Sequence, residues 1–152
     1  MSTPNHVELI ARGILLQGSR VLLCQEKKHG YRYLPGGHVE VTESAAAALE
    51  REFLEECGLR VRTGALALVS EGVFKTKKKT HHEINLVFHV EHPPSPKLKK
   101  VKSKEDRIAF EWVELAALPD LDVRPLAAKA FLATLGSSSD GVVWVSEVPV
   151  GG

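Results

Sequence analysis

Two periods of hydrophobic and polar residues run through this chain, one typical of strands and one typical of helices. β-Formers are dense in residues 6–17 and again in 20–25, on either side of Gly18-Ser19, which predicts a β-hairpin with a two-residue turn. After a polar loop at 26–31, we expect a short strand that ends at Pro35-Gly36-Gly37. Three later strands are expected, over residues 60–74, 83–91 and 108–114.

The helical period is clearest between Ser44 and Cys57. Ser44 is a favoured N-terminal cap, the alanines after it favour helix, and Gly58 stands where a helix is expected to stop. Apolar residues at helical spacing predict a second helix over 124–135. The chain is therefore expected to combine strands with two helices.

Two later stretches break these patterns. Residues 92–104 contain three prolines and five lysines, so we expect an exposed loop there. Residues 136–141 have the composition of a flexible linker, and residues 142–150 predict a final edge strand. That strand either covers its own domain or pairs with a second subunit, and its bare apolar edge favours a homodimer.

Length and composition narrow the class of protein. The 152 residues predict a single domain over 1–152, and 43% hydrophobic against 26% charged residues predict a packed core rather than a disordered chain. No apolar run is long enough to cross a membrane, and the first residues lack the pattern of a signal peptide. We therefore expect a cytoplasmic protein with no membrane partner. Two cysteines are too few for a disulfide framework or a four-cysteine zinc site.

The net charge of +1 conceals two clusters of lysines, which leave the rest of the chain acidic. Such clusters attract phosphates on a ligand, an RNA or a membrane surface, although a solvated basic loop is the commoner explanation. The clusters are Lys75, Lys77, Lys78 and Lys79, and Lys97, Lys99, Lys100, Lys102 and Lys104.

Three carboxylates are concentrated on one face of the first predicted helix. Glu52, Glu55 and Glu56 are spaced i, i+3 and i+4, so they fall within about one turn of each other, beside the apolar residues Leu49 and Phe53. Unpaired, these acids would repel one another. A divalent cation is the simplest way to relieve the repulsion, and hard oxygen ligands favour magnesium or manganese over zinc.

Two glycines just upstream extend this candidate metal site. Gly36 and Gly37 allow the backbone to turn tightly, so that a carbonyl there could reach the same ion. A cation held by carboxylates beside open backbone suits pyrophosphate chemistry, because it neutralises phosphate oxygens and lowers the pKa of an attacking water. The chain has no GxxxxGK[ST] phosphate loop and no recognisable nucleophilic triad, which argues against kinase-like use of a nucleotide.

The same segment carries a family motif. From Gly37 to Leu59 the sequence has Gly37, Glu43, Arg51-Glu52, Glu55-Glu56 and Gly58 at the spacing GX5EX7REUXEEXGU, in which U is a bulky apolar residue. This resembles the complete Nudix box, and aromatic Phe53 is its one loose match. The chain is therefore similar to MutT-like, single-domain Nudix hydrolases.

The resemblance implies an α/β/α sandwich around a mixed β-sheet. It implies that Glu52, Glu55 and Glu56 bind the divalent cations, with Glu56 as principal ligand, and that the carbonyl of Gly36 contributes. It also implies that Arg51 and Glu43, with Gly37 and Gly58, brace the loop against the helix. Magnesium is the expected ion, and manganese can substitute.

The activity that the resemblance implies is hydrolysis of a pyrophosphate bond by a metal-activated water. The substrate is a nucleoside diphosphate linked to a further group X, of the nucleoside triphosphate or nucleotide-sugar type. Signatures that would indicate NADH, coenzyme A, ADP-ribose or dinucleoside polyphosphates are absent. The alternative is a catalytically silent module of the same fold that binds a nucleotide or RNA.

The remaining site residues are less constrained. Some Nudix members carry the general base on a loop that corresponds to Glu105 and Asp106, although Glu55 and Glu83 stay candidates. The alternative for this pair of acids is charge balance against the neighbouring lysines. Substrate contacts are expected from residues near the glycines and the first lysine cluster, although core packing or simple exposure explains each as well. They are Tyr31, Tyr33, His38, Phe74 and Lys77.

Overall fold

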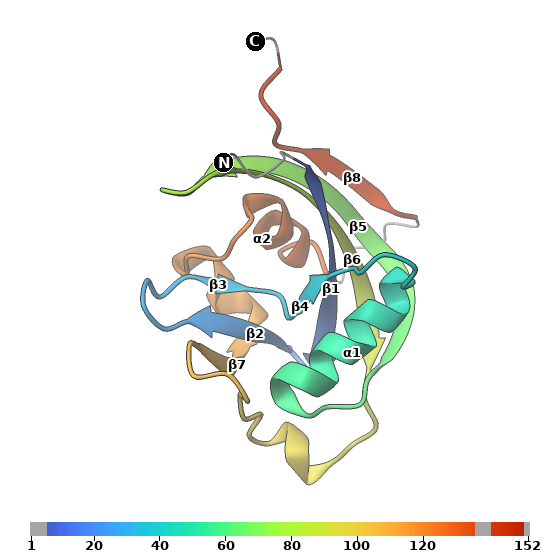
Figure 1. Ribbon diagram of the computed structural model, residues 1–152. Coiled ribbons are helices and arrows are strands. Elements are labelled where there is room, and N and C mark those ends of the chain that lie inside the picture. Colours follow the sequence, from blue (N-terminus) through green and yellow to red (C-terminus); the bar gives the residue numbers. More distant parts are fainter. Residues whose placement is uncertain (1–5, 136–140, 151–152) are drawn as a thin grey trace.

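A long first strand, β1 (Val7–Gln17), lies at the centre of a mixed eight-stranded sheet (Figure 1). The structure is a computed structural model that describes residues 6–135 and 141–150. The sheet order is β3-β2-β1-β6-β5-β8; β4 also pairs with β1, and β7 pairs with β2. The remaining strands are β2 (Arg20–Glu26), β3 (Arg32–Tyr33), β4 (Gly36–His38), β5 (Arg62–Lys75), β6 (Thr80–Glu91), β7 (Ile108–Glu114) and β8 (Val143–Ser146).

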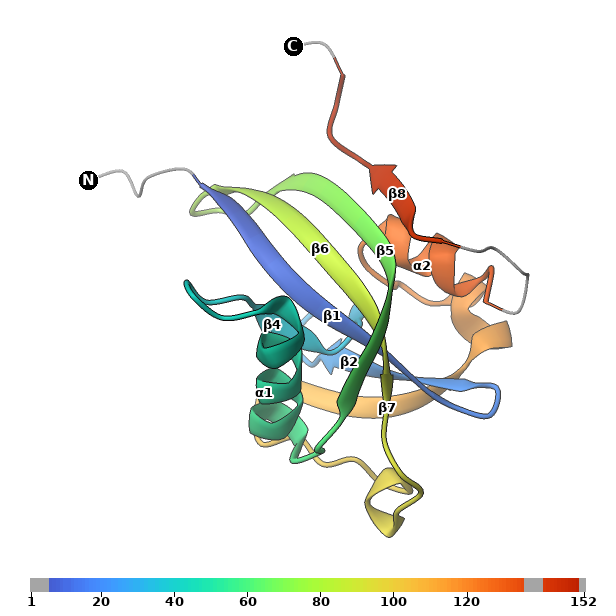
Figure 2. The ribbon, with the colours of Figure 1, turned by 90° about the vertical axis from the view of Figure 1, so that its right-hand side faces the viewer.

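Two helices, α1 (Ala45–Cys57) and α2 (Leu126–Leu132), pack on opposite faces of this sheet (Figure 2). The alternation of side chains along β1 accounts for both contacts, since successive residues of a strand point to opposite faces. Ala11 and Leu15 are buried in the cluster that contains Phe53 of α1, whereas Ile14 is buried with Leu132 of α2. The expected α/β/α sandwich is confirmed.

The ends of α1 are fixed by its own sequence. The Ser44 hydroxyl accepts a hydrogen bond from the backbone N–H of Ala47 at 3.1 Å, which satisfies one of the donors left free at a helix start. At the other end Gly58 adopts a φ of 71°, and its N–H donates to the Leu54 carbonyl at 3.0 Å. The predicted first helix is therefore confirmed, and its acidic face is held in a defined place.

The predicted hairpin is also confirmed, but the strand before the two glycines is not continuous. The turn brings Gln17 opposite Arg20. Beyond it, β3 pairs with β2 whereas β4 pairs with β1, so two short strands replace the one that we expected. The break lies at Pro35, whose carbonyl accepts from the Gly13 N–H at 2.9 Å. A residue without an N–H suits the point where the chain changes partners.

The lysine-rich stretch 92–104 differs from the exposed loop that we expected. It contains a 3₁₀ helix, η1 (Pro96–Leu98), and it buries Leu98 and Val101 in the cluster beneath α1. The indole N–H of Trp112 donates to the Leu98 carbonyl at 2.6 Å. The prediction overlooked these two apolar residues because lysines surround them, and the lysines themselves stay at the surface.

The C-terminal part of the chain continues the sheet. A second 3₁₀ helix, η2 (Leu115–Asp120), precedes α2, which begins only after Pro125 and is shorter than the predicted 124–135. Strand β8 pairs in parallel with β5, from Leu68 opposite Val143 to Glu71 opposite Ser146, so the predicted edge strand covers its own sheet. Most of the expected linker, 136–140, lies outside the described residues. No helix in the described ranges is long and apolar enough to span a membrane.

Candidate active site

Strand β4 brings backbone into close contact with both β1 and α1. At Gly36 the φ angle is 147°, and an added Cβ would lie 1.9 Å from the carbonyl oxygen of Ala11. At Gly37 an added Cβ would lie 2.5 Å from the carboxyl carbon of Glu52. Both positions need glycine, for two different reasons: the first to let β4 pair with β1, the second to leave room for a carboxylate of the helix.

Arg51 ties the loop after β4 to the helix. Its Nε and Nη2 donate to the two oxygens of Glu43 at 2.8 and 2.9 Å, and Nη2 also donates to the His38 carbonyl at 3.2 Å. Its Nη1 donates to Glu52 at 2.9 Å and to Glu55 at 3.2 Å. These hydrogen bonds raise the pKa of the Arg51 guanidinium, and they lower the pKa of the Glu43 carboxyl. Such a planar fork suits the bracing role expected of Arg51 and Glu43.

Glu52 and Glu56 form the buried part of the acidic face. Burial, followed by the negative charges of Glu52 and Glu105 and a hydrogen bond shared with Glu52, raises the pKa of Glu56 to about 8, although the Arg12 charge opposes the shift. Carboxylates crowded in this way suit a divalent cation, which replaces the shared proton as the neutralising charge. The donor set therefore fits the metal expected here.

Glu55 lies apart from this pair. Its side chain is 59% exposed and turned toward Arg51. The loop before β7 approaches α1 instead, since the Lys104 N–H donates to the Glu56 carbonyl at 2.7 Å. Of the two loop acids expected as general base, Glu105 is the one whose charge contributes to the raised pKa of Glu56. Both are exposed at the surface.

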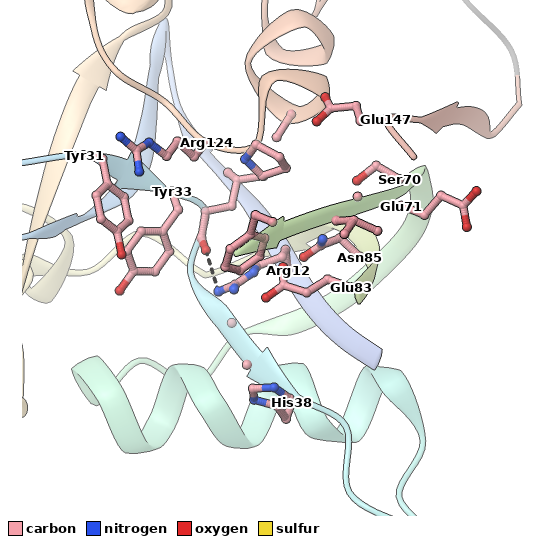
Figure 3. A pocket seen from close by; sticks show the side chains of 18 of the residues that line it. Arg12, Tyr31, Tyr33, His38, Ser70, Glu71, Glu83, Asn85, Arg124 and Glu147 are labelled. Carbon is pink, nitrogen blue, oxygen red and sulfur yellow. Dashed lines mark hydrogen bonds between the residues drawn. The ribbon is translucent and has the colours of Figure 1, made fainter. Parts of the chain in front are cut away.

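A cavity of about 660 Å³ opens beside these carboxylates (Figure 3). Its walls come from β1, β3, β4, β5, β6, α1, α2 and the segment after β8. Four of the five expected substrate contacts line it; the fifth, Lys77, lies in the turn between β5 and β6, outside the lining. The lining residues expected from the sequence are Tyr31, Tyr33, Gly36, Gly37, His38, Glu52, Glu56 and Phe74.

Two arginines in the cavity were not identified from the sequence. Arg12 on β1 donates to the Leu34 carbonyl at 3.2 Å and lies 5.3 Å from the centre of the Tyr33 ring. Arg124 lies 4.5 Å from the centre of the Tyr31 ring and forms an ion pair with Asp122 at 3.0 Å. These pairs place cations against the flat faces of two tyrosines, a suitable wall for an anionic, aromatic ligand.

Most polar residues on the sheet floor were also missed. Ser70 and Asn85 line the cavity from β5 and β6, and Glu147 lines it from beyond β8; Glu83, expected only as a candidate base, lines it from β6. The available signal was weak: a single polar residue, Asn85, inside the apolar run of β6. Which residues of β5 and β6 share the face that lines the cavity follows only from the pairing of these two strands.

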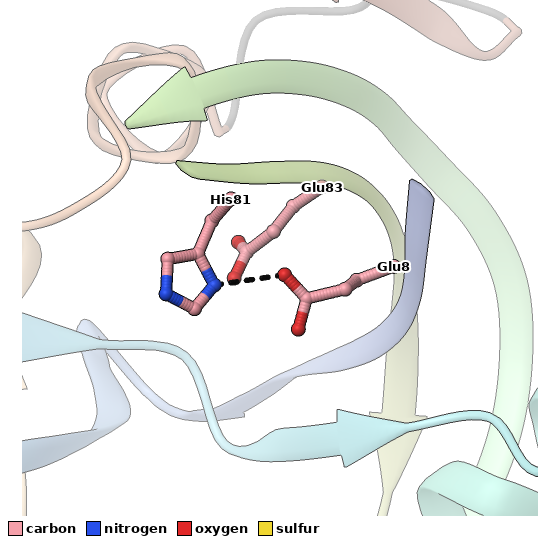
Figure 4. Close-up of side chains that lie close together, drawn as sticks. All are labelled: Glu8, His81 and Glu83. Carbon is pink, nitrogen blue, oxygen red and sulfur yellow. Dashed lines mark hydrogen bonds and ion pairs between the residues drawn. The ribbon is translucent and has the colours of Figure 1, made fainter. Parts of the chain in front are cut away.

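A cluster of side chains extends from the sheet beside the cavity (Figure 4). Glu8, 9% exposed, accepts hydrogen bonds from His81 Nδ1 at 2.9 Å and His38 Nε2 at 3.1 Å, and Lys79 Nζ lies 3.8 Å away. Burial raises the pKa of Glu8, but these partners outweigh it and leave the pKa lowered. Ligand atoms of Glu8, His81 and Glu83 lie within 4.8 Å of one another. The hydrogen bonds and the Lys79 charge already stabilise the ionised form of Glu8 in this arrangement.

Comparison with known proteins identifies the family. The NUDIX domain profile matches residues 8–134. A MutT-like protein of Streptomyces ambofaciens is 28% identical over 109 residues, which cover 72% of this chain and 66% of that protein. An ADP-ribose pyrophosphatase of Methanocaldococcus jannaschii is 28% identical over 121 residues, or 76% of this chain and 67% of that protein. A crystal structure of the MutT protein from Methanosarcina mazei Go1 superposes with a TM-score of 0.66 at 23% identity, covering 87% of this chain and 94% of that one.

The chain therefore belongs to the NUDIX domain family. The expected resemblance and enzyme class, a Nudix pyrophosphohydrolase, are confirmed at the level of the family. Members of this family generally use divalent metals.

Proposed function

We propose that this protein hydrolyses a pyrophosphate bond in a nucleoside diphosphate linked to a further group X, with Mg²⁺ as cofactor and Mn²⁺ as substitute. The observation that carries the proposal is the half-buried pair Glu52 and Glu56, which opens on a 660 Å³ cavity beside the backbone of Gly36 and Gly37. A cavity of that volume lies within the range of small-ligand sites and is large enough for a nucleotide.

In this proposal Glu52, Glu56 and the Gly36 carbonyl hold the cation, and Glu55 contributes from the exposed side of the helix. The cation, when bound, neutralises phosphate oxygens and makes a bound water more acidic. The other roles fall to side chains of the protein. Arg12 binds phosphate oxygens, Tyr31, Tyr33 and Phe74 contact the flat parts of the substrate, and Arg51 keeps the loop closed against the helix.

Removing the charge of Glu56 tests this assignment. We expect Glu56→Gln to lower kcat by at least about a hundredfold, because an isosteric amide cannot serve as an anionic ligand, while circular dichroism and the melting temperature show a folded protein. The assay is phosphate release from nucleoside triphosphates, nucleotide sugars and ADP-ribose, with magnesium or manganese. ADP-ribose belongs in the panel because one relative is named for its hydrolysis.

The matched control is Glu50→Gln, an exposed acid of the same helix, which should retain full activity. Turnover that survives in folded Glu56→Gln would exclude Glu56 as principal ligand. Binding of a nucleotide by the wild type without any turnover would instead favour the silent module.

We propose Glu105 as the general base. It is the loop acid whose charge reaches Glu56, so it lies within electrostatic range of the carboxylate pair. Glu105→Gln should lower kcat by about 10²-fold to 10⁴-fold and remove the acidic limb of the pH profile, whereas Asp106→Asn should alter neither. An unchanged pH profile in Glu105→Gln would exclude Glu105 as the general base and show that another carboxylate has this role.

A further inference from the structure

The floor of the cavity carries three polar side chains without partners. Ser70 is 2% exposed and Asn85 is 5% exposed, and both line the cavity together with Glu83. Within residues 6–135 and 141–150, none of the three side chains forms a hydrogen bond or an ion pair. Their polar atoms open on the cavity, so a ligand bound there can supply their hydrogen-bond partners.

The sheet register places the three side chains together. Ser70 and Asn85 are directly opposite each other on β5 and β6, so they share one face of the sheet. Glu83 lies two residues before Asn85 on that same face, opposite Gly72. At Gly72 an added Cβ would make only an ordinary contact, at 3.9 Å from Glu147 Oε2, so the position opposite Glu83 is not crowded. In Figure 3 the labelled side chains of Glu83 and Asn85 point into the same part of the cavity.

Unlike Glu8, Glu83 has a carboxylate that is free to accept hydrogen bonds from a ligand. Glu8 and Glu83 are opposite each other in the pairing of β1 with β6. Glu8 is engaged by His81, His38 and Lys79, whereas Glu83 has no such partner in the described chain. An ionised carboxylate offers only acceptors, and an asparagine amide offers donors and an acceptor. The floor therefore presents an excess of acceptors to its ligand.

This excess excludes phosphate from the floor. A carboxylate repels an anion, so we expect the diphosphate beside the cation held by Glu52 and Glu56 rather than against Glu83. The part of a nucleotide that brings N–H donors next to a carbonyl or ring nitrogen is the hydrogen-bonding edge of its base.

Building on the proposed function, we infer that Glu83 and Asn85, with Ser70, bind this edge and select a base that carries an exocyclic amino group. Adenine, guanine and cytosine offer that donor to the Glu83 carboxylate. Uracil, thymine and hypoxanthine present a carbonyl or a hydrogen at the corresponding place, and a carbonyl facing Glu83 leaves both acceptors unpaired. A site built to accept a hydrogen bond rejects analogues that lack the donor.

Paired substrates test the selection. We expect the wild type to show kcat/KM at least about tenfold higher for the amino-bearing member of the pair that contains its fastest substrate, CTP against UTP, ATP against ITP or GTP against ITP. Glu83→Gln, which keeps the shape but replaces an acceptor by a donor, should bring that ratio close to one. Asn85→Leu should lower the ratio as well. The control Glu91→Gln changes an exposed acid at the far end of the same strand and should leave the ratio intact.

Equal kcat/KM within every pair, or a ratio that survives in both Glu83→Gln and Asn85→Leu, would overturn the inference. If no nucleotide is hydrolysed at all, the proposed function fails and titration calorimetry with the same pairs decides the inference separately. Tighter binding of the amino-bearing member, lost in Glu83→Gln, would sustain it without turnover. Equal binding, or none, would overturn it.

Discussion

Glu56 is a carboxyl group whose surroundings oppose its ionisation. Its pKa is raised to about 8 by burial, then by the charges of Glu52 and Glu105 and a hydrogen bond with Glu52. In the unfolded chain the same group titrates near pH 4.5. Between those two values the folded state binds more protons than the unfolded state, so this group makes the metal-free protein less stable as the pH rises.

We expect Glu56→Gln to stabilise the metal-free protein at pH 9, on the order of 1 to 2 kcal/mol once solvent screening is allowed for. The gain should shrink toward zero well below pH 4.5, where the wild-type carboxyl is protonated in both states. Urea unfolding with a chelator at both pH values measures it. A wild type more stable than the variant at pH 9 would contradict the raised pKa.

The elements differ in how far the sequence could predict them. Helix α1 was predictable because its signals are local: Ser44 starts it and Gly58 ends it. The division between β3 and β4 was not, because it depends on strands far away in the chain. The acids of α1 were identified by their spacing. Arg12 and Asn85 were missed because their meeting depends on the pairing of β1 with β6, which no local pattern encodes.

The two glycines of β4 are needed for different reasons: we expect Gly36 to matter for folding and Gly37 for metal binding. In Gly36→Ala the new Cβ meets backbone, the Ala11 carbonyl at 1.9 Å, so we expect a large loss of stability. In Gly37→Ala the Cβ meets the mobile end of Glu52, which can turn away, so the fold should survive while cation affinity falls about 10-fold to 100-fold.

Thermal unfolding and calorimetric titration with Mn²⁺ test this pair of variants. A folded Gly37→Ala protein with wild-type cation affinity would show that the position of Glu52 does not matter. A Gly36→Ala protein as stable as the wild type would contradict the close approach of β4 to β1.

Over the whole molecule, the segment after β8 holds α2 in place. Pro125 provides no side-chain cap for α2, and the Glu147 carboxylate accepts from the Ala127 N–H at 2.6 Å instead. The Glu147 N–H donates to the Glu71 carbonyl at 2.8 Å, so one residue joins α2 to β5. The same residue lines the cavity. The homodimer expected from this tail stays a prediction.

Glu147→Ala should lower the free energy of unfolding by about 1 kcal/mol, since it removes a carboxylate cap from a helix start. Glu147→Gln, which can still accept the bond, should cost less. Denaturant unfolding measures both, with exposed Glu91→Ala as a variant that should change little. A Glu147→Ala protein as stable as the wild type would show that α2 is held by its apolar contacts alone.

The cavity is built by two separate sets of elements, and this bears on how new activities arise. The carboxylates and glycines lie on α1 and β4, whereas the polar floor lies on β5 and β6. Mutations at positions 70, 83 and 85 can therefore accumulate without disturbing the residues around Glu56. Substitutions at these three positions, in evolution or in a randomised library, can therefore change ligand preference while selection separately maintains the residues that carry out hydrolysis.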